Sequence, residues 1–261
     1  MELIDTHCHL TFEGLIDDID AVITRSTAAG VTAWITVGTD MNENHKAVEL
    51  ANRFDNLYAA LAIHPHDAKN ATRETINEIK KLACQPKVVA VGETGLDYHY
   101  NHSLRDDQKR IFAQHLTLAA ELRLPVIIHC RKAFGETLQI LEQHGRDVEK
   151  IVFHCFSGSA EQAKILIAKG YYFSFTGVVT FKNAEKTRKA AAVIPLDRLM
   201  LETDCPYMSP EPKRKQKINE PALLIHTASC LARLKNINLP DFGNTVTATT
   251  KSFFNLPGHP A

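Results

Sequence analysis

Short segments of apolar, β-branched residues alternate with longer amphipathic segments along the whole chain. The apolar segments have the length of strands, and several, such as Val126–Cys130 (VIIHC), are almost continuously hydrophobic. Uninterrupted apolar strands are typical of parallel sheets that helices cover on both faces. The pattern predicts eight such strands, over Leu3–His7, Ala33–Gly38, Leu57–His64, Val88–Glu93, Val126–Cys130, Ile151–Phe156, Tyr171–Thr176 and Leu199–Asp204.

A segment with helical periodicity follows each predicted strand. Eight strand–helix pairs in 261 residues match an α/β fold of the (β/α)8 TIM-barrel class, whose typical size is about 250 residues. The alternative is an open doubly wound sheet, which would not usually stop at eight regular repeats. The predicted helices are Leu15–Ala29, Glu43–Phe54, Arg73–Ala83, Leu104–Leu122, Phe134–Gln143, Ala160–Ala168, Ala184–Ile194 and Glu220–Leu234.

The composition shows no boundary between domains. No Ser/Gly-rich linker interrupts the chain, so we expect a single domain over residues 1–261, with one short extra helix over Phe242–Phe253. A core of this size needs no structural metal or disulfide to be stable. Any metal is therefore expected to serve chemistry.

Polar residues follow the apolar runs at the ends of the predicted strands, where the active site of such a barrel is built. Taken singly, a histidine there is more often a core or rim residue than a ligand, and a terminal aspartate is usually a helix cap. Four histidines and two carboxylates converging at one edge would be costly to bury without a cation. The joint pattern therefore predicts metal binding by His7, His9, Glu93, His129, His154 and Asp204.

The grouping of these six residues predicts two metal ions. His7, His9 and Asp204 come from the first and eighth strands, whereas His129 and His154 come from the fifth and sixth. Glu93 lies between the two groups and is expected to bridge them. Such ligands suit Zn, Mn, Ni, Co or Mg with open positions for water. We expect Asp204 to take a proton from the attacking water, or to act only as a ligand.

Net charge limits the kind of substrate contact. Thirty basic and thirty acidic residues give a formal charge of zero, whereas proteins that grip long duplex DNA carry a basic excess. The one basic run, Lys213–Lys217 (KRKQK), is either a local binding patch or a solvated loop. With no signal peptide and no apolar run long enough to span a bilayer, we expect a soluble, cytoplasmic protein with no membrane contact.

The motifs together resemble the TatD family of metal-dependent deoxyribonucleases. The resemblance covers essentially the whole chain, in order, and rests on Ile4–Leu10 (IDTHCHL), Ala62–His66 (AIHPH), Val91–Tyr98 (VGETGLDY), Leu124–His129 (LPVIIH), His154–Gly158 (HCFSG) and Leu201–Tyr207 (LETDCPY). It implies two divalent metals on the same six ligands, Mg²⁺ or Mn²⁺ in use with Zn²⁺ or Ni²⁺ as alternatives. It also implies hydrolysis of DNA phosphodiester bonds from the 3′ end.

Three functions follow as hypotheses. The leading one is a two-metal exonuclease on DNA ends, with single strands favoured because the site lies in the mouth of a barrel and no obligate protein partner implied. The second keeps the metals and changes the substrate to a small cyclic amide, lactone or ester. The third is a non-catalytic binding module. Catalysis is assigned to Asp204 and Glu93, and substrate contacts are expected from His64, Tyr98, Arg131 and Asn219.

Overall fold

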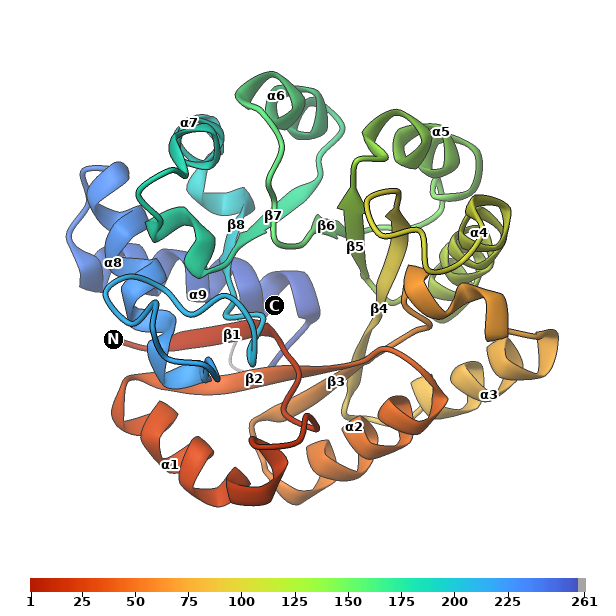
Figure 1. Ribbon diagram of the computed structural model, residues 1–261, viewed down its shortest axis with the longest axis horizontal. Helices are drawn as coiled ribbons and strands as arrows, with labels where there is room; N and C mark the ends of the chain where they lie inside the picture. Colours follow the sequence, from red (N-terminus) through yellow and green to blue (C-terminus); the bar gives the residue numbers. More distant parts are fainter. Residues whose placement is uncertain (258–261) are drawn as a thin grey trace. The chain divides into compact units, whose positions relative to one another are not determined.

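Strands and helices alternate along the chain in the computed structural model, which describes residues 1–257 (Figure 1). Eight strands form one sheet in which each neighbour is the next strand along the chain. Parallel pairing joins β1 to β2, β3 to β4, β4 to β5, β5 to β6 and β7 to β8. The strands are β1 Leu3–Cys8, β2 Val31–Gly38, β3 Leu57–Leu61, β4 Val88–Asp97, β5 Val126–Arg131, β6 Ile151–Phe153, β7 Tyr172–Phe175 and β8 Leu199–Leu201.

This strand order confirms the predicted (β/α)8 class. A doubly wound sheet reverses its strand order at a switch point, and the order β1 to β8 contains no such reversal. The α-helices are α1 Ile19–Ala28, α2 Met41–Arg53, α3 Arg73–Ala83, α4 Arg105–Leu122, α5 Phe134–His144, α6 Ala160–Ala168, α7 Glu185–Val193, α8 Leu224–Leu234 and α9 Leu239–Phe254.

Helix ends agree best with the prediction where a capping box fixes them. Helices α3 and α6 have the predicted bounds, and Thr72 and Ser159 close a reciprocal capping box before them. The predicted helices over 15–29 and 220–234 instead open with a short 3₁₀ turn, at Ile16–Asp18 and Pro221–Leu223. The remaining 3₁₀ turns are Pro65–Asn70, Gly177–Thr180 and Leu196–Arg198.

Four strand ends differ from the prediction by three or more residues, and each of these lies next to a candidate site residue. Strands β3, β6 and β8 stop three residues before the predicted ends, because the chain turns out of the sheet there. Cys155 and Asp204 have positive φ angles of 43° and 53° in these turns. Strand β4 is longer than predicted, since Gly95–Asp97 continues the pairing with β5. His64, His154 and Asp204 thus lie on turns beyond the strands, whereas His7, Glu93 and His129 lie within β1, β4 and β5.

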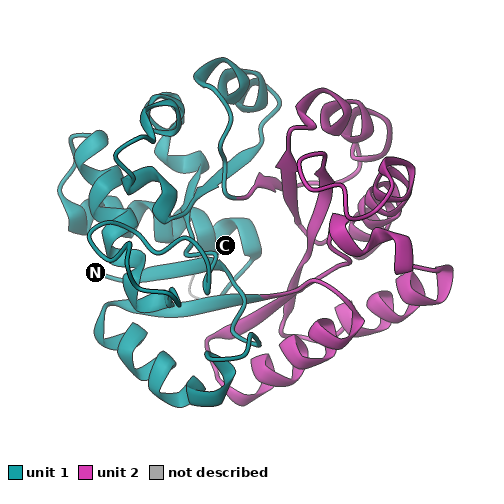
Figure 2. Cartoon of the chain, in the orientation of Figure 1, with its two compact units in different colours: residues 1–36, 155–261 teal, residues 37–154 magenta. Residues whose placement is uncertain are grey.

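The chain divides into two compact units (Figure 2). Unit 1 contains residues 1–36 and the chain from residue 155 onward, with β1, most of β2, β7, β8, α1 and α6–α9. Unit 2 contains residues 37–154, with β3–β6 and α2–α5. The single domain over 1–261 stays a prediction, and its last four residues lie outside the described part of the chain.

Each unit has its own buried apolar residues. In unit 1, Phe173 and Phe175 of β7 and Phe253 of α9 are fully buried. In unit 2, Phe112 of α4 and Phe153 of β6 have the same role. Helix α9 is the predicted extra helix with wider bounds, and Asn238 caps its start by accepting from the Asp241 amide. No helix of the described residues could cross a membrane; the cytoplasmic location stays a prediction.

Candidate functional site

Unit 1 brings three predicted ligands together at the ends of β1 and β8. The Asp204 Oδ1 atom lies 3.7 Å from His7 Nε2 and 3.4 Å from His9 Nε2. One donor atom from each of the three residues falls within 4.8 Å of the others. Main-chain hydrogen bonds hold the two segments side by side, from the Asp204 amide to the His7 carbonyl at 2.9 Å and from the His9 amide to the Cys205 carbonyl at 2.8 Å.

The buried carboxyl group of Asp5 links the two segments that carry this cluster. Asp5 Oδ1 accepts from the amides of Thr203 (2.9 Å) and His7 (3.3 Å), and the Thr203 hydroxyl donates to Asp5 Oδ2 at 2.5 Å. Burial raises the pKa of Asp5 to about 7, against the lowering effect of these hydrogen bonds. Asp5 thus ties the strand that carries His7 to the turn that carries Asp204.

Glu202 is a second buried carboxylate in unit 1, and the sequence analysis gave it no role. Its Oε1 accepts from the Cys155 amide at 2.5 Å and its Oε2 from the Ser174 hydroxyl at 2.6 Å. It therefore fixes the left-handed turn at Cys155, directly after the predicted ligand His154. The signal in the sequence was its position two residues before Asp204, at the end of an apolar strand.

Unit 2 gathers three histidines around Glu93. The Glu93 Oε1 atom lies 2.5 Å from His129 Nδ1, 2.6 Å from His154 Nε2 and 3.5 Å from His64 Nε2. Burial alone would raise the pKa of Glu93, but the neighbouring histidines hold it well below its usual range. Three imidazoles converging on one carboxylate oxygen form a donor set that a divalent cation fits.

His64 belongs to this cluster, although it was predicted as a substrate contact. Its donor atom lies within 4.8 Å of those of Glu93 and His129. Burial lowers the pKa of His64 to about 4, so the imidazole is neutral near pH 7. A neutral imidazole is the form that binds a metal ion.

Asp97 contacts the ring nitrogen of His129 that does not face Glu93, and His66 contacts Asp97 in turn. The sequence analysis predicted neither residue. Asp97 Oδ2 lies 3.1 Å from His129 Nε2 and 3.0 Å from His66 Nε2, and its Oδ1 accepts from the His99 and Tyr100 amides at 2.8 and 3.0 Å. Burial opposes ionisation, but the hydrogen bonds from His129 and the Tyr100 amide hold the pKa of Asp97 well below its usual range. A carboxylate behind a ligating histidine orients its ring.

Both omissions had a detectable signal. Strand alternation places Glu93, Gly95 and Asp97 on one face, because side chains two positions apart point the same way. The spacing of His64-x-His66 repeats that of His7-x-His9. The error came from ending the fourth strand at Glu93.

Two of the predicted substrate contacts in unit 2 lie at the ends of β4 and β5. The Tyr98 hydroxyl donates to Glu136 at 3.0 Å, and the Arg105 guanidinium lies 4.1 Å from its ring centroid. Burial and Glu136 raise the pKa of Tyr98. The Arg131 guanidinium lies 4.7 Å from the Tyr100 ring centroid. Substrate contact by either residue stays a prediction.

Asn219 has a structural position in the loop after β8. It is 1% exposed, and its Nδ2 donates to the carbonyls of Thr203 (3.0 Å) and Tyr207 (2.7 Å) while its Oδ1 accepts from the Glu220 amide at 3.0 Å. The Asn219 side chain thus joins the beginning of this loop to its end. Its contact with substrate stays a prediction.

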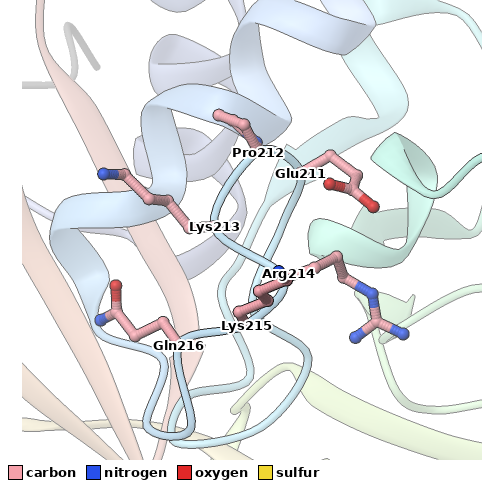
Figure 3. Close-up of a pocket in the computed structure, with 6 residues that line it drawn as sticks. All are labelled: Glu211, Pro212, Lys213, Arg214, Lys215 and Gln216. Atoms are coloured by element: carbon pink, nitrogen blue, oxygen red, sulfur yellow. The ribbon is translucent and has the colours of Figure 1, made fainter.

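The same loop carries the basic run. A hollow there is lined by the segment Glu211–Gln216, and Lys213 and Arg214 extend to opposite sides of the loop (Figure 3). The Arg214 guanidinium stacks 3.7 Å from the Phe181 ring centroid. This contact orders one cation of an otherwise exposed segment.

The two clusters together contain all six predicted ligands. One has His7, His9 and Asp204 in unit 1, and the other has Glu93, His129 and His154 in unit 2 with His64 added. In each, imidazole nitrogens and a carboxylate oxygen converge at strand ends, which is chemistry suited to a divalent cation. The bridging of two ions by Glu93 stays a prediction.

Comparisons with known proteins agree over the full length. The family model described as TatD related DNase matches residues 4–255. The uncharacterized metal-dependent hydrolase YabD of Bacillus subtilis is 40% identical over 254 residues, which are 97% of this chain and 99% of that protein. The 3′-5′ ssDNA/RNA exonuclease TatD of Citrobacter koseri is 36% identical over 97% of this chain and 99% of its own. The solved structure of YjjV, a TatD homologue from Escherichia coli, has a TM-score of 0.92 at 31% identity and covers 98% of both chains.

Proposed function

We propose, from the premise that this chain belongs to the TatD family of metal-dependent hydrolases, that it is a 3′–5′ exonuclease on single-stranded DNA. The observation that carries the proposal is the pair of histidine–carboxylate clusters at the strand ends of the two units. The activity named for the Citrobacter koseri relative supports the choice of substrate. Zero net charge fits an enzyme that holds one strand end over a small area.

The proposed metal ligands are the six predicted residues of these clusters, without His64. His7, His9 and Asp204 would hold one divalent ion, and Glu93, His129 and His154 would hold the other. When bound, such cations stabilise the charge that develops on phosphate oxygens during hydrolysis. We expect Mg²⁺ or Mn²⁺ in use, with Zn²⁺ or Ni²⁺ also accepted.

The protein's own groups supply proton transfer and positioning. We assign Asp204 as the base that takes the proton of the attacking water, because it is the carboxylate among the three grouped residues of its cluster. We assign Glu93 to hold the three imidazoles in place, and Asp97 to orient His129 through Nε2. His64, Tyr98 and Arg131 are the proposed substrate contacts in unit 2, and Asn219 would act by positioning the loop after β8.

The test uses single-stranded oligonucleotides labelled at the 3′ or the 5′ end, across a series of divalent metals. We expect stepwise shortening from the 3′ end, and its loss in Glu93→Ala, His129→Ala and Asp204→Asn. The matched control is His144→Ala, an exposed histidine at the end of α5.

Three results would redirect the proposal. Full nuclease activity in Glu93→Ala or His129→Ala would refute the assigned site. Shortening from the 5′ end would refute the polarity. Hydrolysis of a panel of lactones and cyclic amides without any action on DNA or RNA would replace the nucleic-acid substrate by a small cyclic ester or amide.

A further inference from the structure

Two exposed aromatic side chains lie beside the metal-ligand cluster of unit 1. Phe12 is 40% exposed and Tyr207 is 53% exposed. The Tyr207 ring centroid lies 6.2 Å from that of His9 and 6.0 Å from that of Phe12, in edge-to-face arrangements. The two rings and the imidazole thus form a continuous aromatic surface that starts at a predicted ligand.

Main-chain hydrogen bonds fix the backbone of Phe12 and Tyr207 relative to this cluster. The Phe12 amide donates to the His9 carbonyl at 3.1 Å, and the Tyr207 amide donates to the Asp204 carbonyl at 3.0 Å. Each aromatic residue therefore follows a predicted ligand by three positions, in a closed turn. The Tyr207 carbonyl also accepts from Asn219 Nδ2 at 2.7 Å, which holds the loop from its other end. Because the backbone is already ordered, stacking of a ligand on either ring does not require the loop to be ordered first.

The exposed aromatic residue in unit 2 is in a different situation. The Tyr100 ring is 51% exposed, but the Arg131 guanidinium lies 4.7 Å from its centroid and the His102 ring stacks on it at 5.6 Å with an interplanar angle of 6°. Stacking there is already supplied by the protein's own groups. Phe12 and Tyr207 meet through an edge-to-face contact and are 40% and 53% exposed, so a further flat ring can reach them from solvent.

We propose that Phe12 and Tyr207 form a stacking platform for a nucleobase of the bound single strand, close to the nucleotide whose phosphate is hydrolysed. This inference rests on the proposed function and names the part of the substrate that unit 1 recognises. Stacking on an aromatic ring tolerates every base, since each base has a π face. The platform therefore selects unpaired bases, because a base inside a duplex is already stacked on both sides.

The loop that carries Tyr207 also offers charge for the phosphates of the strand. It continues into Lys213, Arg214, Lys215 and Lys217, all of them exposed. Cations at this spacing suit a phosphate backbone without reading its sequence. An aromatic surface at the cluster, followed by a basic segment, is the arrangement found where proteins hold single strands.

The experiment compares two oligothymidylates that differ only in whether the 3′-terminal nucleotide carries its base or is abasic. Binding is measured by fluorescence anisotropy with chelator present, and cleavage is measured with Mn²⁺. We expect the unaltered protein to prefer the base-bearing strand by about ten-fold, within the range of roughly 5- to 150-fold for one stacked base.

The variants separate a stacked ring from mere bulk. Tyr207→Leu and Phe12→Leu are expected to bring the preference for the base-bearing strand close to one. Tyr207→Phe and Phe12→Tyr keep a ring and should keep the preference. Ile165→Ala, which alters an exposed apolar residue of helix α6, is the control. Because each preference is a ratio within one protein, partial misfolding does not change it.

The outcomes distinguish this inference from the proposed function. If the unaltered protein cleaves both strands equally, or if both leucine variants keep the preference, the platform is refuted while the exonuclease proposal stands. If the unaltered protein neither binds nor cleaves single-stranded DNA, both proposals are refuted.

Discussion

His115 of helix α4 gives the sharpest prediction about the pH dependence of stability. The side chain is fully buried, with Nδ1 2.7 Å from the Thr94 hydroxyl and Nε2 accepting from the Ile63 amide at 3.4 Å. The acceptor role of Nε2 requires the neutral ring, with the proton on Nδ1 directed at Thr94. Protonation would set a second N–H against the Ile63 amide. Burial accordingly lowers the pKa of His115 to about 3.

The size of the effect follows from linkage. An unfolded chain takes up a proton at this histidine below about pH 6.5, whereas the folded protein does so only near pH 3. The folded state is therefore favoured above the unfolded pKa and loses this advantage as the pH falls. Between about pH 7.5 and about pH 5, the two pKa values give a loss of about 2 kcal/mol in the free energy of unfolding.

The assay is urea unfolding of the metal-free protein at these two pH values, for the unaltered chain and for His115→Gln. Glutamine can accept from the Ile63 amide but does not titrate, so the variant should lose about 2 kcal/mol less on acidification. Other titrating groups are common to both proteins and cancel in the difference. His144→Gln, at an exposed site, should behave like the unaltered chain. Equal pH dependence in the unaltered chain and His115→Gln would refute the buried neutral tautomer.

Three further predictions concern stability and are checked by urea unfolding. Asn219→Ala removes three hydrogen bonds of the loop after β8 and should cost about 3 kcal/mol; an unchanged midpoint would contradict this role. Gly95→Ala should lower the free energy of unfolding by more than about 3 kcal/mol or prevent folding, because its φ is +139° and a Cβ would collide with the main chain of β5. Gly135→Ala is the matched control: a Cβ there meets open space, so the free energy of unfolding should rise by about 0.5 kcal/mol. Glu220→Gln weakens the contact with Arg25, whose Nη2 lies 2.8 Å away, and should cost at most about 1 kcal/mol, less at high salt.

The order of elements followed from local patterns. Residues close together in the sequence are enough to show the continuous apolar run of β5 and the helical periodicity of α3. The capping box of α3 likewise shows where that helix begins. The same locality made the six candidate ligands visible, since each lies at or just beyond the end of an apolar run. The sequence by itself therefore determined the fold class and the residue types available for a metal.

The supporting groups depended on tertiary structure. Whether β4 stops at Glu93 or continues to Asp97 depends on its pairing with β5, and only that continuation brings Asp97 against His129. Asn219 was predicted as a substrate contact, yet its position was decided by the carbonyls of Thr203 and Tyr207, to which its side chain donates across the loop. Hydrogen bonds between residues far apart in the chain have no local period, so the sequence determined which donors exist and the folded chain decided which of them meet.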